Sequence, residues 1–138
     1  NTYNYLAGNN KIEGIDHIWF SCHTEEEIKK LVKNKCEEVL NKKFKVSFCC
    51  YTMLATVEPR VHCDLKESCD YQIIIYIKGN SNLHKGTGFY LNNELNTHIG
   101  FNENRAVIWH SNTFHSPLNW ASDDQSKRYS IICQLKEL

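Results

Sequence analysis

Apolar side chains recur at helical spacing in one stretch of the chain, and in short alternating or continuous runs through most of the remainder. The helical stretch runs from about Thr24 to Asn41. Its apolar stripe consists of Ile28, Leu31, Val32, Cys36, Val39 and Leu40. Thr24 is followed three residues later by Glu27, which predicts a capping box at the start of the helix. We expect this helix to cover a sheet with its apolar stripe.

Eight short apolar runs, each bounded by turn residues, predict strands. They are Ile15–Ser21, Phe44–Leu54, Val57–Cys63, Tyr71–Lys78, Gly86–Leu91, His98–Phe101, Arg105–His110 and Arg128–Leu135. The connecting segments 79–82 and 102–104 consist of Gly, Asn, Ser and Glu residues, which predicts hairpin turns within an antiparallel sheet. About eight strands with a covering helix are typical of a double-stranded β-helix, the cupin-like jelly roll in which two sheets enclose a core or a pocket.

The sequence therefore predicts a mainly β fold with one or two covering helices. With 138 residues, 41% of them hydrophobic, the chain is long enough for one core and too short for two domains. We expect a single domain over 1–138, with an N-terminal strand and helix at about 15–42 and a jelly-roll core at about 44–136. The two prolines, Pro59 and Pro117, are expected at strand ends, where a missing N–H does least harm.

Charge and cysteine content narrow the expected partners and compartment. The chain has 16 basic and 16 acidic side chains, so no net field attracts nucleic acid or an anionic membrane, and we expect neither partner. The longest apolar runs are far shorter than a membrane span, and we expect no secretory leader. The seven cysteines lie at Cys22, Cys36, Cys49, Cys50, Cys63, Cys69 and Cys133. Because they form no C-x-x-C pair, we expect reduced thiols in a soluble cytoplasmic protein.

The tripeptide His62-Cys63-Asp64 is the first candidate for chemistry. In a strand, residues two apart point to the same face, so the imidazole and the carboxylate converge while Cys63 points away. Chance alone supplies roughly 0.25 such patterns in a chain of this composition, so further elements are needed. His115 follows 51 positions after Asp64, and Arg128 opens the last predicted strand 13 positions later.

This order and spacing resemble those of the 2-oxoglutarate and iron(II)-dependent dioxygenases, over roughly Tyr51 to Leu135. The resemblance implies that His62, Asp64 and His115 hold iron(II) as a facial triad. Two neutral nitrogens and one carboxylate on one face of an octahedral ion leave three positions open. In the family these positions take two oxygens of 2-oxoglutarate and one dioxygen molecule.

Arg128 is the expected partner of the far carboxylate of 2-oxoglutarate, because a guanidinium fork matches a carboxylate with two parallel hydrogen bonds. Ser130 shares its face of the strand and can donate to the same group. The resemblance to prolyl-hydroxylase-like members adds Tyr76 as a phenol that contacts this carboxylate, and matches Tyr51 to a further contact with the co-substrate.

Two neighbouring segments also resemble the family. Gly86-Thr87-Gly88-Phe89-Tyr90 is similar to the glycine-containing strand that follows the central hairpin, although a tight strand entry explains its glycines equally well. Trp109 and His110 end the strand before the distal ligand, and we expect them to line the pocket. His110 is not expected to be a ligand, because His115 has the Phe-His pairing of the family.

The resemblance implies an oxygenase that couples decarboxylation of 2-oxoglutarate to succinate with oxidation of a substrate. The short chain is similar to stand-alone, prolyl-hydroxylase-like members of phage and bacteria, which favours hydroxylation of a peptide or small molecule. Selectivity is expected in loops, at Asn92–Thr97, Ser116–Lys127 and the first dozen residues. Three alternatives stay open: a cupin-like metal enzyme that uses no keto acid, a non-catalytic jelly-roll binding module, and a cysteine nucleophile with a histidine base. The sequence leaves the oligomeric state open.

Overall fold

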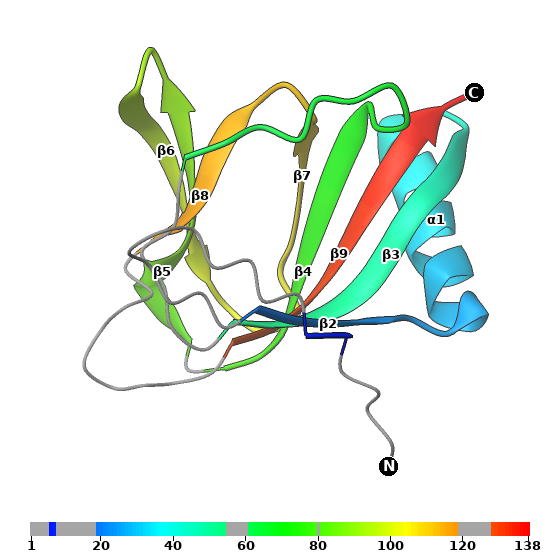
Figure 1. The fold of residues 1–138 in the computed structure, drawn as a ribbon, viewed down its shortest axis with the longest axis horizontal. Helices are drawn as coiled ribbons and strands as arrows, with labels where there is room; N and C mark the ends of the chain where they lie inside the picture. The colour runs from blue at the N-terminus through cyan, green and yellow to red at the C-terminus, as the bar shows by residue number, and fades with distance from the viewer. Residues whose placement is uncertain (1–5, 8–18, 55–60, 80, 119–127) are drawn as a thin grey trace.

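The protein forms two antiparallel sheets and one helix in a computed structural model that describes residues 6–7, 19–54, 61–79, 81–118 and 128–138 (Figure 1). The elements are β1 (Leu6–Ala7), β2 (Trp19–His23), α1 (Glu26–Leu40), β3 (Phe44–Leu54), β4 (Tyr71–Lys78), β5 (Asn82–Leu91), β6 (Glu94–Phe101), β7 (Ala106–His110), β8 (Phe114–Leu118) and β9 (Arg128–Glu137). The large sheet has the order β1-β2-β3-β9-β4-β7, and the small sheet has the order β6-β5-β8.

The large sheet separates two cores. On one face, α1 packs through Val32 and Cys36 against Phe44, Ile73 and Leu135 of the sheet. On the other face, Ile74, Tyr76, Trp109 and Ile132 of the large sheet pack with Phe89 and Phe101 of the small sheet. Figure 1 shows the helix and the small sheet on opposite sides of the large sheet. The predicted mainly β jelly roll with a covering helix is confirmed.

The helix is confirmed, but its predicted cap is wrong. The N-cap residue is Glu25, whose side chain makes no capping hydrogen bond. Thr24 instead donates from Oγ1 to the carbonyl of Cys49 at 3.3 Å, so β3 takes the hydroxyl that the capping box would need. The expected stripe is also narrower, because Leu31 and Val39 are 65% and 64% exposed. No helix in the described ranges is long and apolar enough to span a membrane.

Strand prediction succeeds where the apolar runs are long. The bounds of β3 and β4 match the predicted strands, whereas residues 15–18 and 57–60 of two other predicted strands lie outside the described residues. Residues 61–63 contribute one isolated bridge, between His62 and His115, and no regular strand. β8 was not predicted. It contains Pro117 at the edge of the small sheet, where a missing N–H leaves the pairing with β5 intact.

The two predicted hairpin turns connect different sheets. The segment after β4 leads to β5 of the small sheet, and residues 102–104 lead from β6 back to β7 of the large sheet. The hairpin within the small sheet lies between β5 and β6, at Asn92 and Asn93, which have φ values of 53° and 65°. Positive φ at both central residues is the requirement of a type I′ hairpin turn, and asparagine tolerates it well.

One cysteine pair departs from the expected reduced state. Cys49 of β3 and Cys133 of β9 are direct cross-strand partners with a Cα–Cα distance of 4.1 Å, and their sulfur atoms are bonded. Cys22, Cys36, Cys50, Cys63 and Cys69 carry free thiols. The expectation of reduced thiols was therefore wrong for this pair, because the register of β3 and β9, which brings the two together, is not readable from cysteine spacing.

Candidate metal and co-substrate site

Backbone hydrogen bonds bring the three predicted metal ligands together. The N–H of His62 donates to the carbonyl of His115 at 3.0 Å, and the N–H of His115 donates back at 2.8 Å. The N–H of Asp64 donates to the carbonyl of Ser111 at 3.0 Å. These bonds fasten residues 62–64 to β8 and to the turn before it, so ligands that lie about fifty positions apart in the sequence become neighbours.

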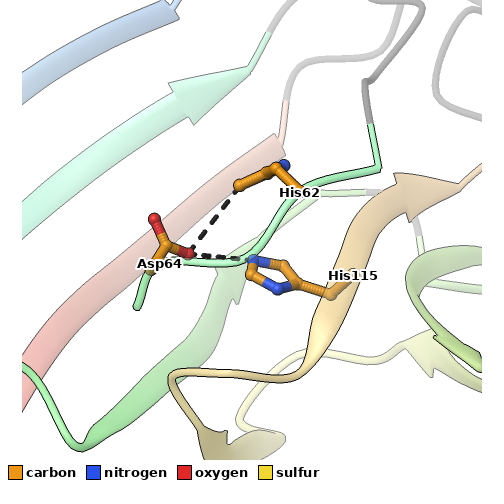
Figure 2. A group of neighbouring side chains, drawn as sticks. All are labelled: His62, Asp64 and His115. Carbon is orange, nitrogen blue, oxygen red and sulfur yellow. Dashed lines mark ion pairs between the residues drawn. The ribbon is translucent and has the colours of Figure 1, made fainter. Parts of the chain in front are cut away.

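The three side chains converge on one point. One ligand atom from each of His62, Asp64 and His115 lies within 4.8 Å of the others. Asp64 Oδ2 is 3.2 Å from His115 Nε2 and 3.8 Å from His62 Nε2 (Figure 2). His115 is buried, Asp64 is partly exposed, and His62 is half exposed, so the cluster opens toward solvent on the His62 side.

The hydrogen bonding of His115 fits a bound cation. Its Nδ1 lies 2.9 Å from the carbonyl of Thr113, and because a carbonyl can only accept, Nδ1 carries the proton. Nε2 then lies 3.2 Å from the buried Asp64 Oδ2, with which it can share either a proton or a metal ion. Two acceptors at this distance need a positive charge between them, and a carbonyl bond on the far nitrogen is the usual support of a metal-bound histidine.

The electrostatics keep the carboxylate of Asp64 ionised. Burial by itself raises the pKa of Asp64, but the neighbouring His115 and the positive charges available on His62, His115 and Lys66 more than offset it. The pKa of Asp64 therefore lies below its ordinary value. The ionised form is the one that binds a metal ion.

Arg128 lies at the other end of the same pocket and is only 4% exposed. Its Nη1 donates to the carbonyl of Gly86 at 2.9 Å, and the guanidinium lies over the rings of Tyr76 and Phe101 at 5.5 and 5.8 Å. Burial lowers the pKa of Arg128 to about 10, with the opposing influence of Tyr76 smaller. A guanidinium buried in this way gains strongly from an incoming carboxylate, since both partners are then out of water.

Gly86 has a structural reason to be glycine. Its φ is +146°, and a Cβ at this position would overlap the carbonyl oxygen of Ile99 on β6. Its own carbonyl accepts from Arg128, so the close approach of β5 to β6 also sets the position of the guanidinium. Gly86 therefore allows β5 to pack closely against β6, and its carbonyl also positions Arg128.

A pocket between the two sheets joins the ligand cluster to Arg128. Its lining consists of Thr52, His62, Gln72, Ile74, Thr87, Trp109, His115, Pro117, Arg128, Ser130 and Ile132. Ser130 lies on this lining, as its shared face with Arg128 predicted. Tyr76 is fully buried beside it, with its hydroxyl 2.6 Å from Thr87 Oγ1 and its ring beneath Arg128.

Tyr51 lies on the opposite face of the sheet, which corrects its predicted place in the co-substrate site. It packs with the helix-side core and donates from its hydroxyl to Glu25 at 2.6 Å. A bulge between Val46 and Phe48 shifts the register of β3 by one residue, which turns Tyr51 toward α1 and Thr52 into the pocket. Simple alternation counted from Phe44 gives the reverse, so neither the strand pattern nor the resemblance that suggested Tyr51 reveals the face on which it lies.

The two residues expected to line the pocket at the end of β7 separate. Trp109 is buried in the lining, with its ring centroid 4.9 Å from that of His115. His110 is exposed and its ring lies 4.3 Å from Tyr71, on the helix side of the sheet. Adjacent residues of a strand point to opposite faces, so Trp109 faces the pocket and His110 faces the helix side.

Sequence reasoning also missed two residues of the pocket lining, Gln72 and Thr87, both of which are polar and buried.

Comparison with known proteins supports the fold. No family model matches the chain, and no curated protein matches it significantly. Among solved structures, the chain is similar to a protein from Burkholderia pseudomallei described as an oxidoreductase of the 2OG-Fe(II) oxygenase family, with a TM-score of 0.65 and 8% identity. The match covers 88% of this chain and 65% of that protein, so this chain spans less than two thirds of its length. The likeness shows a shared fold.

Proposed function

We propose that this chain is an iron(II)- and 2-oxoglutarate-dependent oxygenase that oxidises, and typically hydroxylates, a peptide or a small molecule. The observation that carries the proposal is the pairing of two features in one pocket: the convergence of His62, Asp64 and His115, and a buried arginine at the other end. The fold shared with an oxidoreductase of this class supports the same assignment.

The protein's own residues would do the following work. His62, Asp64 and His115 would hold iron(II), with Asp64 as the anionic ligand and the Thr113 carbonyl fixing the ring of His115. Bound iron(II) would supply the redox chemistry by which dioxygen cleaves 2-oxoglutarate to succinate and carbon dioxide and oxidises the substrate. Arg128 would anchor the far carboxylate of the co-substrate, with Ser130 beside it. The apolar side chains of Ile74 and Ile132 would exclude water from the middle of the pocket.

Arg128 distinguishes this proposal from a cupin-like metal enzyme that uses no keto acid. Burying a guanidinium carries a large desolvation cost, and replacement of a buried ion pair by apolar residues is often neutral or stabilising. A site that binds only metal and substrate gives no role to a positive charge at the far end of its pocket. A charge of this kind is instead suited to a ligand with a second carboxylate.

Anaerobic reconstitution tests the proposal. The wild type and an Arg128→Ala variant are loaded with iron(II) and titrated with 2-oxoglutarate, and the charge-transfer absorption of the iron–keto acid complex is followed. The wild type is expected to develop the band and, in air, to release succinate. The variant is expected to retain iron and to bind 2-oxoglutarate at least about a hundredfold more weakly, because two charge-assisted hydrogen bonds are lost. Equal binding by both proteins would remove the co-substrate assignment.

A matched histidine pair tests the ligand assignment. His115→Ala is expected to abolish iron retention, whereas His110→Ala, five residues away on the exposed end of β7, is expected to retain it. Metal content is measured by elemental analysis after gel filtration. The opposite result would show that the distal ligand has been misassigned.

A further inference from the structure

Two buried polar side chains in the pocket lack hydrogen-bond partners among the described residues. Gln72 is 6% exposed and its Oε1 is unpaired, while Trp109 is 9% exposed and its Nε1 is unpaired. Both residues line the pocket. Buried polar groups in native proteins nearly always have a partner, because leaving one unpaired carries the full cost of desolvation. Their partner is therefore expected in the pocket itself.

The two side chains lie at the metal end of the pocket. Gln72 of β4 and Trp109 of β7 are direct cross-strand partners, and the indole ring is in contact range of the ring of His115. Tyr76, which lies beneath Arg128, is four residues further along β4, roughly 13 Å at the usual rise of about 3.3 Å per residue. Polar groups thus stand at both ends of the pocket.

The middle of the pocket is apolar. Ile74 of β4 and Ile132 of β9 are direct partners, and both line the pocket between the Gln72 end and the Arg128 end. The lining therefore has the sequence polar, apolar, cationic along the strands. A ligand that matches it has an oxygen-rich group at one end, methylene groups in the middle and a carboxylate at the other end, as 2-oxoglutarate does.

We propose that Gln72 and Trp109 bind the carboxylate next to the keto group of the co-substrate, at the metal end of the pocket. The inference rests on the proposed function and deepens it. The indole N–H can only donate, which suits an anionic oxygen, and a half-turn of the Gln72 amide exchanges Oε1 for its two N–H donors. Within the described part of the chain, Gln72 Oε1 and Trp109 Nε1 find no partner, and a bound carboxylate would supply one to each side chain, so the two residues are expected to raise affinity at some cost in folding stability.

Two keto acids separate the two ends of the pocket. 2-Oxoglutarate has both carboxylates, whereas 2-oxobutyrate has only the one next to the keto group. Binding to zinc-loaded protein is measured by calorimetry, so turnover is not needed. Gln72→Leu and Trp109→Phe are each expected to weaken both keto acids by about tenfold. Arg128→Ala is expected to weaken 2-oxoglutarate alone. Ile73→Val, next to Gln72 on β4 but in the helix-side core and outside the pocket lining, is expected to change neither by more than about threefold.

Two further measurements exclude a purely structural role. The chain has three tryptophans, so an indole N–H spectrum of ¹⁵N-labelled protein shows three signals, and Trp109→Phe assigns one. That signal is expected to move when 2-oxobutyrate is added to the wild type. Gln72→Leu removes a buried Oε1 that has no partner among the described residues, and it is expected to leave the urea midpoint unchanged or raised. A structural residue would instead lower it.

The outcomes separate the inference from the function on which it rests. If 2-oxoglutarate binds in an Arg128-dependent way but the Gln72 and Trp109 variants bind both keto acids as the wild type does, the inference is overturned and the proposed function stands. A Trp109 signal that stays in place on saturation with 2-oxobutyrate also overturns the inference alone. If the wild type binds neither keto acid, both are overturned.

Discussion

Replacing Tyr76 by Phe removes a buried hydroxyl that lies 2.6 Å from Thr87 Oγ1, between the two sheets. Tyr76 is 0% exposed and Thr87 is 3% exposed, so a hydroxyl that loses its partner here is shielded from bulk water. Tyr76→Phe is therefore expected to lower the free energy of unfolding by about 1–3 kcal/mol, and Thr87→Val by a similar amount, because each leaves one hydroxyl unpaired. The double variant removes both hydroxyls and is expected to cost about 1–2 kcal/mol less than the sum of the two single changes.

The assay is urea unfolding of the four proteins, followed by circular dichroism. Additivity within about 0.5 kcal/mol would refute the reasoning, since it would mean that the two hydroxyls do not depend on each other.

The same four proteins test which hydroxyl contacts the co-substrate. Thr87 lines the pocket, and the hydroxyl of Tyr76 already has Thr87 as its partner. If Tyr76 donates to Thr87, the proton of Thr87 remains available for a ligand in the pocket. We expect Thr87→Val to weaken 2-oxoglutarate binding more than Tyr76→Phe does. The reverse order would instead support the direct contact of Tyr76 that the resemblance implied.

Three further predictions concern positions outside the ligand cluster. Phe44→Ala, at a fully buried site beneath α1, is expected to lower the free energy of unfolding by about 3–5 kcal/mol without changing iron affinity in the folded fraction. Gly86→Ala places a Cβ against Ile99 and is expected to lower both stability, by about 2 kcal/mol or more, and 2-oxoglutarate affinity; unchanged values would contradict the close approach of β5 to β6. Asp70 accepts from the Glu137 N–H and from Lys136, which hold its pKa below the ordinary value. Asp70→Asn is therefore expected to lower the melting temperature at neutral pH, and the difference is expected to vanish as pH falls through the lowered pKa, where the wild-type carboxylate is protonated.

The sequence allowed the prediction of features set by local pattern and by motif spacing. β4 could be predicted from its continuous apolar run, because most of the strand is buried. α1 could be predicted from its apolar stripe, because one side of the helix is buried. The spacing of His62, Asp64 and His115 led to the residues that the structure brings together.

Features set by long-range register could not be predicted in this way. A single bulge in β3 reverses the faces to which Tyr51 and Thr52 point, relative to simple alternation. β3 contains no Gly or Pro that would indicate the bulge in the sequence. β8 contains a proline, so its local sequence favours a loop. It is a strand because it pairs with β5. Whether a turn joins two strands of one sheet or strands of different sheets also depends on which strands pair. Short turn sequences do not determine this pairing.

Gln72 illustrates a signal that is visible in the sequence alone. It is the one amide in the run Tyr-Gln-Ile-Ile-Ile-Tyr-Ile of β4, and residues 71–74 at the start of this run are buried on both faces of the strand. Alternation cannot explain a polar residue there, because no face of that segment meets water. A side chain that breaks the local pattern in this way must be offset by some interaction, and native sequences retain such exceptions mainly at functional positions. Gln72 is the cross-strand partner of Trp109, whose ring lies 4.9 Å from that of His115, and its Oε1 has no partner among the described residues. The exception therefore falls where the proposed co-substrate needs polar contacts.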